Sequence, residues 1–238
     1  MTQVTNPIQA CNDIFFRPAS VFEALKTNNN WSWIPFIIVS ILAILPNYLY
    51  FSSVDPTWYT EYVSTTHADF QELSPAEIDT IMQFQQPETL ALWGGIGGIV
   101  GLIIINAIVA VYYNLVTRAD EDNLMGFTDW YGATWWMAMP VVLGSLASIL
   151  AILLTNDAGQ IQLQAISATS LAFIFSVGID SHWFNFLNSI RIETFLSIYI
   201  AACAIGTWTR FSFQKSVILA AIPTVVVYGL SFIYMVLN

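Results

Sequence analysis

The sequence predicts an all-α membrane protein with five transmembrane helices, an extra interfacial or re-entrant helix and a short acidic helical loop on the outer side. Hydrophobic residues make up 56% of the 238 residues, and Lys and Arg together number only six. The run 90–116 contains no charged residue, and about 20 apolar residues are enough for a helix to cross the hydrocarbon core of a bilayer. Such a chain has no soluble surface unless lipid covers it.

The chain begins with a polar and amphipathic segment, residues 1–30, that we place in the cytoplasm. Its apolar residues recur at helical spacing, and Pro18 stands where a second short helix can begin, since a missing N–H is harmless in a first turn. Two interpretations of this segment stay open: an anchor lying in the membrane interface, or a docking surface for a cytoplasmic partner. The first span follows at about 31–51, and we expect Pro46 to kink or end it.

The second span, about 90–116, is predicted to be the centre of the helix bundle. Gly94, Gly98 and Gly101 fall on one stripe of this helix and leave a face without side chains. In lipid, close backbone contact at small residues matters more for helix association than apolar burial does, so this face is a candidate packing seam. Asn106 is the most deeply placed amide; an interhelical hydrogen bond is its expected role, and a substrate contact is the alternative.

The third span, about 130–154, offers a second seam of small residues. Gly144 and Ser148 lie four residues apart on it, which makes them a candidate mate for the glycine face. Pro140 is expected to bend this span because proline lacks the N–H that the helix would use.

The outer loop, residues 54–89, contains seven acidic residues and neither Lys nor Arg. Ser74 and Glu77 form a capping-box pattern with Pro75 between them, which predicts a helix from Pro75 to about residue 85. We expect a solvated acidic loop, and the collection of cations or the binding of a basic partner are the alternatives.

Segment 160–178 is too short and too polar for a clean crossing, so an interfacial or re-entrant helix is predicted there. The fourth and fifth spans follow at about 192–208 and 216–237.

Basic residues predict the orientation of the five spans. With the N-terminus in the cytoplasm, the outer side holds only Arg191, whereas the other five basic residues fall on the inner side: Arg17, Lys26, Arg118, Arg210 and Lys215. This bias is the one that orients membrane proteins. We therefore expect a multi-pass protein of the cytoplasmic (inner) membrane with its C-terminus outside, organised as the segment 1–30 followed by a membrane domain, 31–238.

The sequence offers no set of residues suited to catalysis. No ionisable residue lies well inside a predicted span, although proton- and ion-coupled carriers normally need one. The motifs of metalloproteases, serine hydrolases and phosphate-binding loops are absent. His67 and His182 lie in separate outer loops, which is weak support for a metal site or a membrane-bound hydrolase. We expect no enzyme activity, catalytic residue, cofactor, metal or nucleic-acid partner.

Two stretches of the chain resemble the Yip family, the five-span Ypt/Rab-interacting membrane proteins, in its bacterial branch. The first is DIFFRPASVFEALKTNNNWSWIP, residues 13–35, with its apolar pair, its proline and an aromatic residue before the first span. The second is LNSIRIETFLSIYIAACAIGTWTRFSFQKSVILAAIP, residues 187–223, with Gly206 in a small-residue span and a short turn that ends at Lys215. Gly206 thereby joins the candidate packing residues. The acidic loop is longer than the family pattern.

The resemblance implies a function in membrane assemblies. Eukaryotic relatives bind prenylated Rab-type GTPases and shape or sort vesicle membranes, and some bacterial members accompany ABC exporters of the macrolide-exporter type and assist their assembly. We therefore expect a non-enzymatic accessory or assembly subunit. Besides membrane lipid, its expected partner is a membrane protein such as an ABC exporter subunit, or a second copy of itself. The alternative function is a self-associating channel or permease for small solutes or cations.

Overall fold

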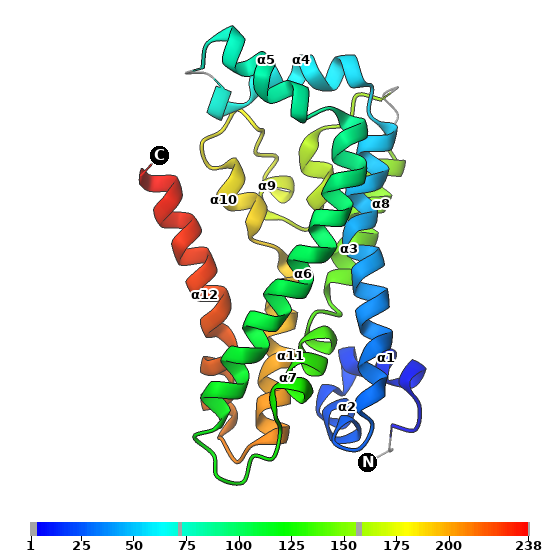
Figure 1. Cartoon of the computed structure of the whole chain (residues 1–238), viewed down its shortest axis with the longest axis vertical. Helices are drawn as coiled ribbons and strands as arrows, with labels where there is room; N and C mark the ends of the chain where they lie inside the picture. Colours follow the sequence, from blue (N-terminus) through cyan, green and yellow to red (C-terminus); the bar gives the residue numbers. More distant parts are fainter. Residues whose placement is uncertain (1–3, 71–72, 156–158, 238) are drawn as a thin grey trace. The chain divides into compact units, whose positions relative to one another are not determined.

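The computed structural model describes residues 4–70, 73–155 and 159–237, and the regular structure in these ranges is helical apart from one isolated β-bridge (Figure 1). The chain divides into two compact units. Unit 1 comprises Met1–Ile41, Gly101–Val142 and Glu193–Val227, and unit 2 comprises Leu42–Val100, Leu143–Ile192 and Tyr228–Asn238. Three long helices continue from one unit into the other: α3 (Trp33–Ser53), α6 (Pro87–Thr117) and α12 (Phe213–Leu237).

Each of the five predicted spans is helical. Among the described residues, four stretches are long and apolar enough to cross a membrane: Asn30–Ser53, Pro87–Thr117, Phe127–Leu153 and Phe213–Leu237. The fourth predicted span is α11 (Ile192–Trp208), an apolar helix of 17 residues. At a rise of about 1.5 Å per residue, α6 alone is roughly 46 Å long, well over the thickness of a hydrocarbon core. The protein is a membrane-embedded, multi-pass protein.

Two prolines act differently from each other. The third span is divided into α7 (Phe127–Met137) and α8 (Val141–Leu153), so the helix is interrupted at Pro140, where a bend was predicted. Pro46 lies inside α3, which continues to Ser53. The expectation that Pro46 ends the helix is therefore wrong, because proline removes one backbone hydrogen bond and a long apolar helix can retain the others.

Unit 1 contains the N-terminal helices and, among the described residues, the buried tryptophans. Helices α1 (Pro7–Phe16) and α2 (Pro18–Leu25) are followed by a 3₁₀ turn, η1 (Asn29–Ser32). Ile14 and Phe22 are fully buried in the same apolar core as Trp130 and Trp136. The amphipathic segment is thus packed into this unit, and the predicted helix start at Pro18 is confirmed.

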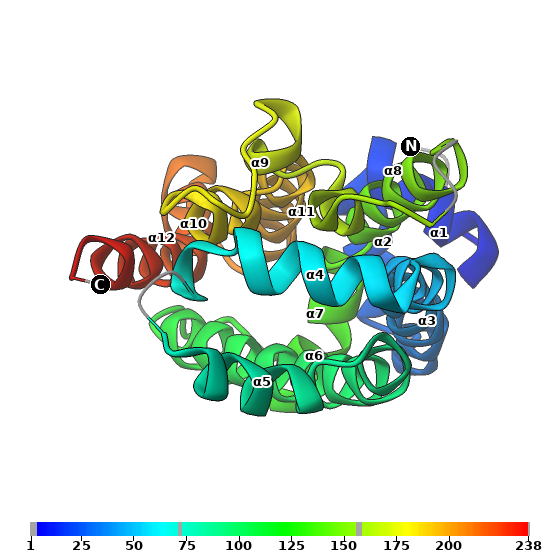
Figure 2. The ribbon, with the colours of Figure 1, turned by 90° about the horizontal axis from the view of Figure 1, so that it is seen from above.

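Unit 2 contains the acidic loop and several short helices. The loop forms α4 (Pro56–Thr66), the turn η2 (Ala68–Phe70) and α5 (Pro75–Phe84), and Figure 2 shows α4 and α5 as neighbouring helices. The predicted capping box is confirmed: Ser74 Oγ accepts from the Glu77 N–H, and the Glu77 carboxylate accepts from the Ser74 N–H at 2.9 Å. Glu72, one of the seven loop acids, lies outside the described residues.

Segment 160–178 does not form one helix. It contains the 3₁₀ turn η3 (Leu163–Ser167) and a single turn of α-helix, α9 (Leu171–Ile174), and α10 (Phe184–Ser189) follows. Side chains from two other parts of unit 2 hold it: Ser148 Oγ accepts the Ala168 N–H at 2.9 Å, and Arg191 Nη2 donates to Ser167 Oγ at 3.0 Å. Each helical piece is far shorter than a crossing requires.

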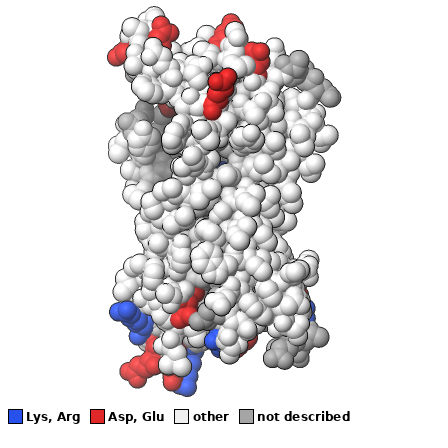
Figure 3. Space-filling view, turned by 45° about the vertical axis from the view of Figure 1, so that its right-hand side comes forward, with Lys and Arg blue, Asp and Glu red and all other residues white. Residues whose placement is uncertain are grey.

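Charge is distributed unequally between the units. Unit 1 contains five of the six basic residues, and unit 2 contains only Arg191. Figure 3 shows acidic side chains without basic ones over the part of unit 2 that holds α4 and α5, side chains of both charges over part of unit 1, and broad uncharged surface elsewhere on this face. The uncharged surface includes many exposed apolar side chains of α6 and α12, as expected of helices that face lipid.

Candidate functional site

The glycine face of α6 is in contact with α3 inside unit 2. A Cβ atom added at Gly94 would lie 2.9 Å from Asn47 Nδ2, and one added at Gly98 would lie 3.4 Å from Ile44 Cγ2. Asn47 Nδ2 also donates to the backbone oxygen of Leu90 at 3.2 Å. Close approach at the glycines therefore brings an amide of α3 to a carbonyl of α6, and sequence reasoning missed Asn47.

The glycine-rich part of α6 also has positions that no neighbour fills. A Cβ atom at Gly97 or Gly101 would have no described heavy atom within 4 Å. Asn106 is 7% exposed, and its Nδ2 donates to the oxygen of Leu102 at 2.9 Å. This bond lies within α6, whereas an interhelical bond was predicted for this amide.

The remaining seam residues lie elsewhere. Gly144 and Ser148 are buried on α8, but Ser148 binds the segment after α8, and the side chains nearest to Gly94 and Gly98 come from α3. A Cβ atom at Gly206 would lie 3.5 Å from Ser216 Oγ, where α11 approaches α12 within unit 1. The seven predicted residues are therefore divided between the two units and do not form one site.

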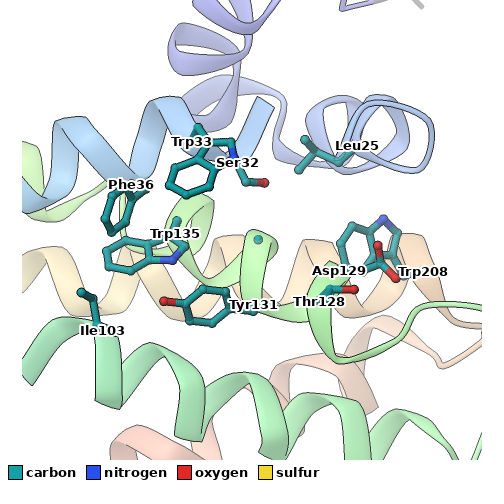
Figure 4. A pocket seen from close by; sticks show the side chains of 11 residues that line it. Leu25, Ser32, Trp33, Phe36, Ile103, Thr128, Asp129, Tyr131, Trp135 and Trp208 are labelled. Atoms are coloured by element: carbon teal, nitrogen blue, oxygen red, sulfur yellow. The ribbon is translucent and has the colours of Figure 1, made fainter. Parts of the chain in front are cut away.

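Unit 1 contains a pocket of about 440 Å³, shown in Figure 4. Its walls come from α2, η1, α3, α6, α7 and α11, and they are lined by Leu25, Ser32, Trp33, Phe36, Ile103, Thr128, Asp129, Tyr131, Gly132, Trp135 and Trp208. A volume of this size lies within the range of small-molecule sites. The sequence shows the crowding of aromatic residues at the starts of two spans, but that pattern is also typical of interfacial belts, so the pocket was missed.

Aromatic contacts hold the pocket walls in place. The Phe36 ring is edge-on to Trp33 and to Trp135, with centroids 5.6 and 4.8 Å apart. Ser32 Oγ accepts from Trp136 Nε1 at 3.2 Å. A Cβ atom at Gly132 would lie 2.7 Å from Ser32 Oγ, so a larger residue there would force the Ser32 side chain to move. The walls of the cavity are thus formed by side chains that pack against or hydrogen-bond one another.

Ion pairs of unit 1 lie outside this pocket. Arg17 Nη2 binds both oxygens of Asp13, at 2.8 and 2.9 Å, and this hydrogen bonding lowers the pKa of Asp13 below its ordinary value. Arg210 pairs with Asp122 at 2.6 Å, and its backbone N–H donates to Asp120 at 2.5 Å. The two Arg210 contacts connect the loop after α6 to the turn between α11 and α12.

A family model described as the Yip1 domain matches residues 12–235. The chain belongs to the Yip1 domain family. The match begins within α1 and ends near the end of α12, so in this Yip1-domain protein it includes the packed N-terminal helices as well as the spans. No curated protein and no solved structure matches the chain. The resemblance drawn from residues 13–35 and 187–223 is confirmed.

The two histidines of this Yip1-domain protein have separate surroundings. His67 Nδ1 accepts the Asp69 N–H at 3.3 Å, and His182 Nε2 lies 2.6 Å from the oxygen of Met235. Within the described ranges, no group of three His, Cys, Asp or Glu residues is close enough to hold a metal ion.

Four polar residues of the predicted spans, those best placed to line a channel, are also divided between the units. Asn106 and Asn114 belong to unit 1, and Ser145 and Ser148 belong to unit 2.

Proposed function

We propose that this Yip1-domain protein is a non-enzymatic accessory or assembly subunit that packs against a larger membrane complex, such as an ABC exporter. One observation carries the proposal: α6 has a glycine face that this chain fills only in part. Gly94 and Gly98 pack against α3, whereas Gly97 and Gly101 have open space beside them. Only 17% of the most apolar stretch of α6 is buried inside the chain.

A glycine face without a neighbour is a favourable place for another helix. Lipid chains are as apolar as leucine, so two helices gain little from burying apolar side chains, and close van der Waals contact between backbones becomes the main attraction. Gly97 and Gly101 are four residues apart and therefore lie on one side of α6. A partner helix that docks there would reach the backbone of α6 directly.

The orientation belongs to the same proposal. The segment 1–30 and the loops that carry five of the six basic residues lie in the cytoplasm, and the acidic loop 54–89 lies on the outer side. The assembly is then located in the cytoplasmic membrane.

Purification of Gly101→Leu from native membranes in mild detergent tests the proposal. Gly229→Leu on α12 is the matched control, because Gly229 also has open space beside it and lies on a lipid-facing helix. We expect the wild-type protein and Gly229→Leu to retain a stoichiometric membrane-protein partner that Gly101→Leu loses. A wild-type protein that purifies without such a partner, or Gly101→Leu that retains it, contradicts the proposal. Cation flux through liposomes containing the wild-type chain alone contradicts it as well.

A further inference from the structure

We propose that the aromatic pocket of unit 1 binds one membrane phospholipid by its ester-linked acyl chain. The proposal rests on three properties of the pocket: where it opens, what lines it, and which hydrogen-bond donors reach it. It does not depend on the accessory function, because the site lies entirely within this chain.

The pocket opens where the protein faces lipid. Trp33 begins α3 and is 65% exposed, and Ile103 lies within α6 and is 37% exposed. Both residues belong to stretches long and apolar enough to cross a membrane. The molecules present at the highest concentration around such side chains are phospholipids, so their acyl chains are the first candidates to enter the space between them.

The lining is apolar on one side and contains both apolar and polar residues on the other. Figure 4 shows Phe36, Trp135 and Ile103 on one side of the pocket, and Thr128 and Asp129 on the other. Flat aromatic walls suit a hydrocarbon chain, which needs contact area and no hydrogen bonds. The polar residues suit the glycerol and headgroup region of the same molecule.

Two donors at the pocket lack a partner within the described part of the chain. The indole Nε1–H of Trp135 and the hydroxyl of the half-buried Tyr131 donate no hydrogen bond to a described atom, and neither atom is fully enclosed, so both donors remain accessible to a molecule in the pocket. A donor that faces a space lined by apolar rings finds an acceptor only on a molecule that enters that space. The acceptor that matches donors beside an acyl chain is the carbonyl of its ester.

Native mass spectrometry of the full chain in detergent, titrated with dioleoylphosphatidylethanolamine, tests the site. We expect one saturable lipid per wild-type chain. Ile103→Trp places an indole in the cavity and should abolish the adduct, whereas Ile104→Trp is the matched control, because Ile104 is exposed and does not line the pocket. Retention of the lipid by Ile103→Trp, or wild-type protein that carries only detergent, overturns the proposal.

A second comparison remains decisive if Ile103→Trp fails to fold. A diether phospholipid has the same chains but no ester carbonyls. We expect the wild-type chain to bind it about three- to tenfold more weakly than the diester, which is the size of one net hydrogen bond. Trp135→Phe keeps a ring in the wall and removes the donor, so it should reduce this preference. Equal binding of the two lipids by the wild-type chain overturns the proposal.

Discussion

The interiors of the two units of this protein are stabilised by different kinds of contact. In unit 1, large rings are packed against each other: Trp130, Trp136 and Phe22 are fully buried, and Trp208 donates to the Phe22 oxygen at 2.8 Å. In unit 2, the buried residues within the described ranges include tyrosines and phenylalanines but no tryptophan. Its short helices depend on caps and on side-chain bonds to loop backbone. Unit 1 should therefore respond most strongly to lost volume, and unit 2 to lost hydrogen bonds.

The largest effect is expected from Trp130→Ala. Trp130 is fully buried, and its ring lies 4.9 Å from that of Trp208, so truncation leaves a large cavity between α7 and α11. Removal of a buried large aromatic side chain costs about 3–5 kcal/mol. Thermal unfolding in detergent should show a much lower midpoint, whereas Trp93→Ala, at a position 63% exposed in unit 2, should leave it nearly unchanged. Similar losses for both variants would contradict the comparison.

A second contrast, between local signals and contacts that are distant in sequence, explains what the sequence could predict. Apolar length predicted the spans, Pro140 predicted an irregularity where α7 and α8 are now seen to separate, and Ser74 with Glu77 predicted the cap of α5, because each of these signals is local. The short pieces of segment 160–178 are positioned by Ser148 and Arg191, which are distant in sequence. No local pattern contains those contacts, so one helix was expected there and two separate pieces were found.

The candidate site shows the same limit. The glycines of α6 are visible as a stripe in the sequence, but which of them contact α3 depends on the positions of Ile44 and Asn47. The aromatic pocket is formed by residues from six elements, and the sequence showed only that aromatics are frequent at the starts of two spans. Composition therefore predicted the kind of surface, and tertiary packing decided where it is filled and where it is open.

The second largest effect is expected from Gly98→Leu. Its side chain would meet Ile44, which already lies 3.4 Å from the position of a Cβ atom, and overpacking of this kind costs about 1–3 kcal/mol. Gly97→Leu is the control one residue away, because the space beside Gly97 is open. We expect a lower yield of folded protein, measured by size-exclusion chromatography in detergent, for Gly98→Leu alone. Equal tolerance at both positions would refute a role for this contact in packing α6 on α3.

A smaller effect is expected from Tyr50→Phe in unit 2. The fully buried Tyr50 hydroxyl donates to the oxygen of Ile161 at 2.8 Å, and its removal should cost about 1 kcal/mol. The matched variant in unit 1 is Tyr113→Phe, whose hydroxyl donates to the Ala220 oxygen at the longer distance of 3.4 Å. Thermal unfolding should show the larger loss for Tyr50→Phe. The reverse order would mean that unit 2 does not depend on this bond.

The smallest effect is expected from protonation of Asp13. Because its bonds with Arg17 lower the pKa of Asp13 in the folded chain, the pair stabilises α1 at pH values above the unfolded pKa of about 3.9, and this stabilisation is lost as pH falls through the folded pKa. Hydrogen exchange of α1 amides should therefore accelerate, after correction for the intrinsic rate, when pH is lowered below about 4. Asp13→Asn should remove this dependence in α1. It should leave intact the similar dependence of α5, where bonds with Ser74 lower the pKa of Glu77. If the pH response of α1 persists in Asp13→Asn, a group other than Asp13 causes it.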